Sequence, residues 1–130
     1  MPPRITVVGS LNTDLVIRSS ALPQPGETIT GGEFATFPGG KGANQAVAAA
    51  RLGAQVVMVG CVGGDDFGRR LIEGLRQDGI DVSRIRVDGG SASGTALITV
   101  GPAGQNTIVV APGANLRLAA ADVAAGLTAG

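Results

Sequence analysis

The chain has 130 residues, 44% of them hydrophobic and 15% charged, a composition that supports a folded core and excludes a disordered protein. Ten basic residues balance ten acidic ones, so no net charge favours nucleic acid or an anionic membrane as the partner. The lack of histidine excludes a Ser-His-Asp triad and histidine metal ligands, and the only cysteine, Cys61, lies in an apolar run and is expected to be buried.

The first predicted element is a buried strand over residues 5–9, a β-branched run. Asn12 and Asp14 follow at its carboxyl end, where open α/β sheets bind their ligands. Because the two residues are two positions apart in an extended segment, their side chains face the same way, and an amide beside a carboxylate suits a pair of sugar hydroxyls. An ordinary polar turn is the alternative, which the spacing alone slightly favours.

Three short strands are predicted at residues 15–18, 28–30 and 33–37, with a proline-stiffened loop at 22–27 and a glycine break at 31–32. These strands lie too close together in the sequence for a helical crossover between them. We therefore expect them to pair antiparallel, apart from the main sheet.

A glycine-rich stretch at residues 39–42 leads into a predicted alanine-rich helix over 45–52, which Gly53 ends. A glycine loop before a helix presents free N–H groups, which suit anions and hydroxyl-rich ligands. Lys41 and Asn44 add a charge and a side chain that both donates and accepts hydrogen bonds. The spacing matches neither a Walker A loop nor a dinucleotide-binding fingerprint, and a simple tight connection is the alternative.

The middle of the chain continues the alternation of strands and helices. An apolar run at residues 56–62 is typical of a parallel strand covered on both faces. Asp65 or Asp66 is predicted to cap a helix over residues 67–77, and a short strand at 85–87 follows. The alternation predicts an α/β, doubly wound fold.

The last predicted elements are a hairpin, with strands at residues 95–100 and 107–111, and a weak helix over 116–127. The main sheet then holds about three strands, whereas a doubly wound sheet normally has more. We therefore expect the fold to be incomplete at residue 130.

Several sequence blocks together resemble a known family. They include Gly-Gly-Lys-Gly-Ala-Asn, and the whole set lies at residues 9–14, 25–28, 39–45, 63–68, 93–98 and 112–115. Their order over the whole chain is similar to that in the ribokinase-like (PfkB-type) carbohydrate kinase family. The resemblance implies a three-layer α/β sandwich with a mainly parallel sheet and a small antiparallel β lid. Residues 1–130 would form the N-terminal part of this domain, with the lid contributed by about 14–37 and 95–111.

The resemblance is strongest to family members that transfer the γ-phosphate of ATP to the 5-hydroxyl of D-ribose. It implies a sugar site formed by Asn12, Asp14, Gly40, Lys41, Gly42, Asn44, Ala96 and Ile98. The first two residues would hydrogen-bond the sugar hydroxyls, and the last two would form an apolar wall over the sugar. The remaining residues would complete the site, with Gly39 and Gly42 shaping the loop.

The catalytic half of such a kinase is missing from these residues. The resemblance implies ATP, Mg²⁺ and a monovalent cation such as K⁺ as cofactors, bound near a late Gly-Ala-Gly-Asp motif that supplies the catalytic base. The motif does not occur here, so we expect neither a catalytic residue nor a metal site in this chain. Asp65 and Asp66 are not substitutes, because helix capping explains their position. We therefore expect this chain alone to be inactive.

The alternatives are a non-catalytic sugar-binding or dimerisation fragment, another sugar or nucleoside kinase of the family, and a truncated product without a function. The expected partners are D-ribose or a similar pentose and a second copy of the chain, paired through the lid as a homodimer. No nucleic acid or membrane is expected. A cytoplasmic location is expected, since no apolar stretch approaches the roughly 20 residues of a membrane span and one unpaired cysteine suits a reducing compartment.

Overall fold

The base of the molecule is a parallel sheet of three strands, here called the base sheet. The computed structural model describes residues 1–128, and residues 129–130, where the predicted domain ends, lie outside the described residues. Strands β1 (Arg4–Val8), β4 (Gln55–Gly63) and β5 (Ile85–Asp88) lie in the order β1-β4-β5, and both pairs are parallel. The predicted α/β class and the three strands of the main sheet are confirmed.

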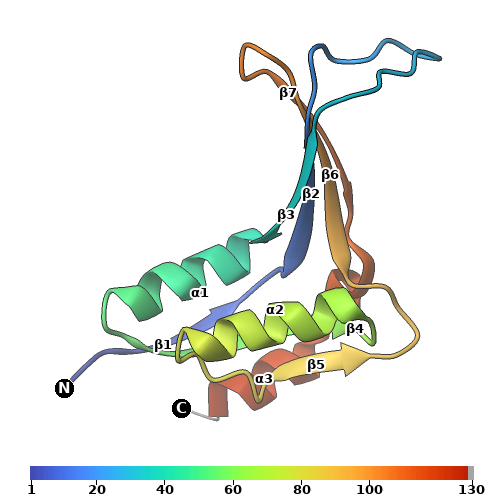
Figure 1. Ribbon diagram of the computed structural model, residues 1–130. Coiled ribbons are helices and arrows are strands. Elements are labelled where there is room, and N and C mark those ends of the chain that lie inside the picture. Colours follow the sequence, from blue (N-terminus) through green and yellow to red (C-terminus); the bar gives the residue numbers. More distant parts are fainter. Residues whose placement is uncertain (129–130) are drawn as a thin grey trace.

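Helices cover both faces of the base sheet (Figure 1). Helices α1 (Lys41–Arg51) and α2 (Asp66–Gln77) lie on one face, and α3 (Ala120–Thr128) lies on the other. Among residues 1–128, no helix is long and apolar enough to cross a membrane.

The side chains of β4 alternate between these two layers, as expected for a strand buried on both faces. Met58 and Val62 belong to the core beneath α1 and α2. Val59 and Cys61 are equally buried, and Val59 lies against Gly126 of α3. Cys61 is 1% exposed, which confirms the prediction of a buried side chain, and burial raises the pKa of its thiol.

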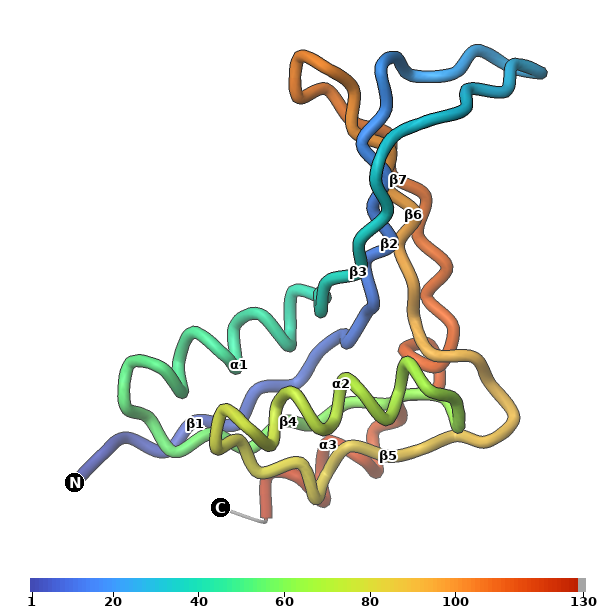
Figure 2. Tube along the Cα trace, in the orientation of Figure 1, coloured from blue at the N-terminus to red at the C-terminus, as the bar shows by residue number. Residues whose placement is uncertain are grey.

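A second sheet, here called the outer sheet, stands away from the base (Figure 2). Its strands are β2 (Asn12–Arg18), β3 (Glu33–Gly39), β6 (Gly94–Val100) and β7 (Asn106–Ala111), in the order β3-β2-β6-β7. The β2–β3 and β6–β7 pairs are antiparallel, as predicted, but β2 and β6 are parallel. The sheet is therefore mixed rather than antiparallel. The reason is that β2 and β6 each follow a strand of the base sheet and run outward from the same edge.

Two predicted elements differ from the structure. Residues 28–30 form no strand, because Gly31 and Gly32 take φ of 116° and 100°, outside the β region, and turn the chain toward β3. The helix predicted over 116–127 is divided into a 3-10 helix η1 (Gly113–Arg117) and α3, because Leu118 is extended between them.

The helix predicted over residues 45–52 begins four residues earlier, at Lys41. The low helix propensity of glycine predicted a loop at residues 39–42. In the folded chain, Gly42 is buried against Gly9, so packing selects the helical turn despite the propensity.

A network around Asp65 joins the base sheet to the start of β6. Of the two predicted candidates, Asp65 and Asp66, it is Asp65 that caps α2, by accepting a hydrogen bond from the N–H of Gly68 at 2.9 Å. Its carboxylate also accepts from the hydroxyl of Ser93 at 2.6 Å and from the Ser93 N–H at 2.9 Å. Burial alone raises the pKa of Asp65, but these hydrogen bonds outweigh it and hold the pKa below its ordinary value. The network therefore fixes where the outer sheet leaves the base.

Candidate functional site

The glycine stretch packs directly on the turn between β1 and β2. A Cβ on Gly42 would lie 2.7 Å from the backbone of Gly9 and Ser10, and one on Gly40 would lie 2.5 Å from the carbonyl oxygen of Ser10. Gly40 also has a φ of 93°, which favours glycine. The N–H of Ala43 donates to the Ser10 carbonyl at 3.0 Å. The start of α1 is thus held at the carboxyl edge of the base sheet, as predicted for a ligand site.

Helix α1 has no capping side chain at its N-terminus, where Gly40 is the N-cap residue. The N–H of Asn44 donates to the Gly40 carbonyl at 2.9 Å, whereas the N–H groups of Lys41 and Gly42 donate to no acceptor within residues 1–128. These two groups and the positive end of the helix dipole suit an oxygen-rich ligand.

Four of the predicted site residues lie on one face of the outer sheet, here called the site face. Asn12 and Asp14 are two positions apart on β2, so their side chains lie on the same face. The register pairs Asp14 with Ala96 on the neighbouring strand β6. Ile98 is two positions further along β6, so it points to the same side. The structure therefore brings two polar and two apolar side chains together, near the foot of the sheet where α1 begins.

Asp14 is a half-buried carboxylate without a protein partner. Its side chain forms no hydrogen bond or ion pair within residues 1–128, and burial raises its pKa above the ordinary value. The carboxylate lies over Gly39, where a Cβ would come within 2.6 to 2.8 Å of its atoms. Gly39 therefore leaves room for the carboxylate. An acceptor of this kind, partly removed from water and unpaired, suits a hydroxyl-bearing ligand.

Asn115 completes the foot of the site, and the sequence interpretation assigned it no role. Its Nδ2 donates to Oδ1 of Asn12 at 2.8 Å, although the two residues are 103 positions apart. The only signal in the sequence was its place in the 112–115 block, where an asparagine after Pro-Gly is typical of a turn. Asn115 belongs to η1, so the loop after β7 returns to the start of β2.

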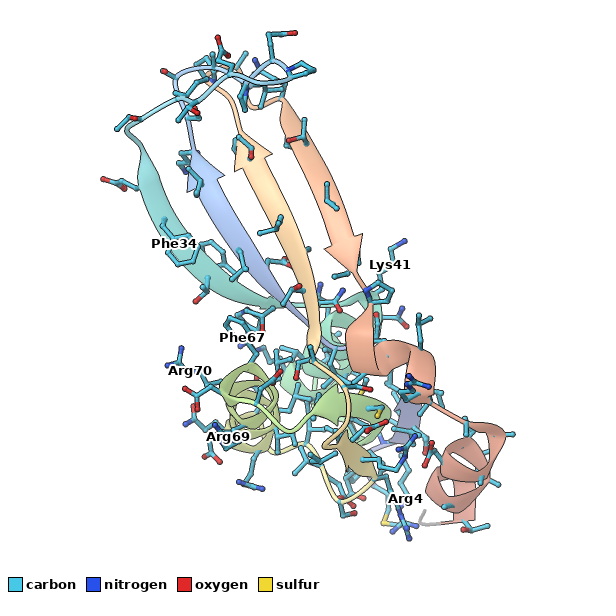
Figure 3. All side chains as sticks on the ribbon, turned by 90° about the vertical axis from the view of Figure 1, so that its right-hand side faces the viewer. Arg4, Phe34, Lys41, Phe67, Arg69 and Arg70 are labelled. Atoms are coloured by element: carbon cyan, nitrogen blue, oxygen red, sulfur yellow. The ribbon has the colours of Figure 1, made fainter. Side chains whose placement is uncertain are left out.

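Lys41 and Asn44 lie at the first turn of α1, and both are exposed. Figure 3 shows Lys41 at the foot of the outer sheet, with Phe34 on β3. Neither Lys41 nor Asn44 forms a side-chain hydrogen bond or ion pair within the described residues. Asn44 lines a groove of about 440 Å³ between α1 and α2. The structure thus does not join these two residues to Asn12 or Asp14 by any hydrogen bond, and their roles stay predictions.

The part of the chain that the structure describes contains no cluster of acidic, thiol or imidazole side chains. Within residues 1–128, no group of three or more carboxylate, thiol or imidazole side chains lies close enough to form a metal site. The two carboxylates discussed above lie in different places. Asp14 is half-buried on the site face, and Asp65 is hydrogen-bonded at the start of α2.

Comparison with known proteins gives consistent matches. The family model described as pfkB family carbohydrate kinase matches residues 2–126. The chain is 50% identical over 111 residues to the ribokinase of Bacillus subtilis, covering 85% of this chain and 38% of that protein. It is 46% identical over 114 residues to the ribokinase of Haemophilus influenzae, covering 88% of this chain and 37% of that protein.

A solved structure of a ribokinase also matches this chain. The ribokinase of Arabidopsis thaliana, complexed with ribose and ATP, matches with a TM-score of 0.79 at 37% identity, over 88% of this chain and 38% of that one. The chain therefore spans 37% to 38% of the length of these relatives.

Proposed function

The chain belongs to the pfkB family of carbohydrate kinases, and on this premise we propose that it forms the sugar-binding part of a kinase that phosphorylates the 5-hydroxyl of D-ribose. The observation that carries the proposal is the half-buried, unpaired carboxylate of Asp14 beside Asn12 on the site face. The similarity to proteins named ribokinase supports ribose as the sugar.

The proposed roles of the site residues follow from their positions. Asp14 accepts hydrogen bonds from sugar hydroxyls, and Asn12 adds a second polar contact from the same face. Ala96 and Ile98 provide an apolar wall above them, which helps to exclude water from the reacting hydroxyl. The loop residues Gly40, Lys41, Gly42 and Asn44 add N–H groups and polar side chains at the helix start.

We also propose that the outer sheet acts as the family's lid and that ATP, Mg²⁺ and K⁺ bind to residues outside this chain. Residues 1–130 contain no Gly-Ala-Gly-Asp motif, and the described residues hold no cluster suited to a metal. Phosphoryl transfer depends on positioning and charge stabilisation, to which this chain contributes the sugar side.

The first experiment compares the chain with a chimaera. The chimaera joins residues 1–128 to the part of Bacillus subtilis ribokinase that follows the matched segment. With ATP, Mg²⁺, K⁺ and D-ribose, the chimaera is expected to release ADP only when ribose is present. The 130-residue chain is expected to release none. The readout is coupled ADP release with intact mass measured on the same samples.

Two outcomes would contradict these proposals. ADP release by the isolated chain would show that a complete site forms within it. A folded chimaera without ribose-dependent turnover would refute the assignment of ribose, and a panel of other pentoses and nucleosides on the same sample would identify the alternative.

The opposite face of the outer sheet supports the proposal of a homodimer. Four apolar side chains on that face are 44% to 67% exposed: Ile17, Phe34, Leu97 and Val109. Contiguous exposed apolar residues mark interaction surfaces, and the family resemblance implies pairing through the lid.

Leu97→Lys is expected to convert the dimer into a monomer, as measured by sedimentation. Leu52→Lys, a substitution of an 89% exposed leucine outside this sheet, is the matched control and is expected to leave the dimer intact. A monomeric parent would contradict the proposal.

A further inference from the structure

The orientation of the Asn115 amide is determined by backbone groups whose donor and acceptor roles are fixed. Its Oδ1 accepts from the N–H of Leu11 at 2.9 Å. Its Nδ2 carries two hydrogens and has three acceptors within hydrogen-bond distance, so at least one hydrogen is shared. Two of these acceptors are the carbonyl oxygens of Leu11 at 3.1 Å and Pro112 at 2.9 Å. A flipped amide would place two acceptors against each other at Leu11 and Pro112 and two donors at the Leu11 N–H. Nδ2 of Asn115 therefore faces Asn12.

The orientation of Asn115 determines that of Asn12. Because Nδ2 of Asn115 donates at 2.8 Å, the atom of Asn12 that meets it must be the acceptor Oδ1. The Nδ2 group of Asn12 then points away from Asn115 and forms no hydrogen bond within residues 1–128.

We infer that Asn115 is a positioning residue that turns the Asn12 amide so that Asn12 meets the sugar as a hydrogen-bond donor. The inference rests on the proposed function and adds a chemical specificity to it. Asn12 donates to a hydroxyl oxygen, and Asp14 on the same face accepts from a hydroxyl hydrogen. A donor beside an acceptor is complementary to hydroxyl groups, which act as both.

Gly94 makes this contact sterically possible. It pairs with Asn12 in the register, and a Cβ on Gly94 would overlap both Nδ2 of Asn115 and Oδ1 of Asn12. Its φ lies outside the left-handed region, so the backbone itself would accept alanine. Gly94→Ala is therefore expected to push the Asn12 and Asn115 amides apart, while both asparagine side chains are kept.

The functional test measures discrimination between sugars in the full-length chimaera. D-ribose is compared with 2-deoxy-D-ribose and 3-deoxy-D-ribose, which keep the reacting 5-hydroxyl. We expect the parent to prefer ribose over one of these sugars by about tenfold or more, because a donor left without its hydroxyl is unpaired in the complex. Asn12→Ala, Asn115→Ala and Gly94→Ala are each expected to remove most of that preference, mainly through KM for ribose.

Two further variants separate positioning from a general structural effect. Asn115→Asp keeps an oxygen for the Leu11 N–H but presents an acceptor to Asn12, so the Asn12 amide is expected to turn over and the preference to fall. The same oxygen also faces the carbonyls of Leu11 and Pro112, so the free energy of unfolding is measured beside the preference to show any general loss of stability. The Asn12→Ala/Asn115→Ala double variant is expected to lose no more preference than either single variant, since both act through one contact. Gly74→Ala in α2, where a Cβ meets open space, is the matched glycine control and should keep the preference.

The outcomes distinguish the inference from the proposed function. If the parent chimaera turns over ribose and Asn115→Ala weakens all three sugars equally, the inference is wrong and the proposed function stands. Additive losses in the double variant would overturn the inference in the same way. If the folded parent does not act on ribose, the proposed function fails, and the inference fails with it.

Side-chain amide NMR of the ¹⁵N-labelled chain tests the geometry without activity. The Nδ2 protons of Asn115 are expected to exchange slowly with water, and those of Asn12 to exchange at the rate of a free amide. Protected Asn12 protons beside freely exchanging Asn115 protons would overturn the inference.

Discussion

Asp14→Asn is expected to lower kcat/KM of the chimaera for D-ribose by about 100-fold or more. Hydrogen bonds to a charged group contribute about 1.5–3 kcal/mol each, and Asp14 is proposed to accept more than one of them. Asparagine keeps the size of the side chain but replaces one acceptor by a donor, which opposes a hydroxyl hydrogen. The loss is expected mainly in KM, because the carboxylate binds the sugar and does not touch the transferred phosphoryl group.

The raised pKa of Asp14 adds a pH dependence to this prediction. Sugar binding needs the ionised carboxylate, so KM for ribose is expected to rise as the pH falls through the raised pKa, at a higher pH than an ordinary aspartate would require. Asp14→Asn is expected to remove this acidic limb. A profile of KM against pH for both proteins is the measurement.

The effect of Asp14 on stability has the opposite sign. A carboxyl whose pKa is raised by burial binds its proton more tightly in the folded than in the unfolded state. The free energy of unfolding is therefore expected to increase as the pH falls through the raised pKa, and to be lower at neutral pH, where the half-buried carboxylate is charged. Asp14→Asn is expected to increase the free energy of unfolding at pH 7 while it weakens sugar binding.

Glu33→Gln is the matched control. Glu33 lies on the site face at the far end of β3, is exposed, and forms no ion pair within the described residues. It is expected to change neither KM nor its pH profile. An unchanged affinity in Asp14→Asn would show that the sugar does not bind at this carboxylate.

Gly42→Ala is expected to destabilise the chain by about 1–3 kcal/mol, the usual effect of overpacking. In an exposed helix, alanine in place of glycine is instead stabilising by about 1 kcal/mol. The sign reverses here because a Cβ would lie 2.7 Å from the backbone of Gly9 and Ser10, and backbone atoms cannot move aside as a flexible side chain does. The substitution also separates the start of α1 from Ser10, so sugar affinity is expected to fall with stability.

Urea unfolding of the chain measures this prediction, with Gly74→Ala as the control. Gly74 is also a helical glycine, but its Cβ would meet nothing within 4 Å, so Gly74→Ala is expected to stabilise the chain. If both alanine variants stabilised the chain equally, the close contact between α1 and the β1–β2 turn would be wrong.

Local patterns in the sequence were sufficient for the base of the fold. The apolar run of β4 and a capped start of α2 at Asp65 or Asp66 each depend on neighbouring residues, so they could be predicted without the tertiary structure. The alternation that places Asn12 and Asp14 on one face of β2 is equally local, since successive side chains of a strand point to opposite faces. The alternating strands and helices likewise predicted the parallel base sheet.

Only the tertiary structure decided how distant segments meet. The parallel pairing of β2 with β6 depends on where two strands of the base sheet end, and the early start of α1 depends on the packing of Gly42 on Gly9. The inferred donor role of Asn12 depends on its contact with Asn115, which is 103 positions away. The orientation of the Asn115 amide depends in turn on the backbone groups that it contacts. Such contacts leave no local period in the sequence, because their geometry exists only once the chain has brought the segments together.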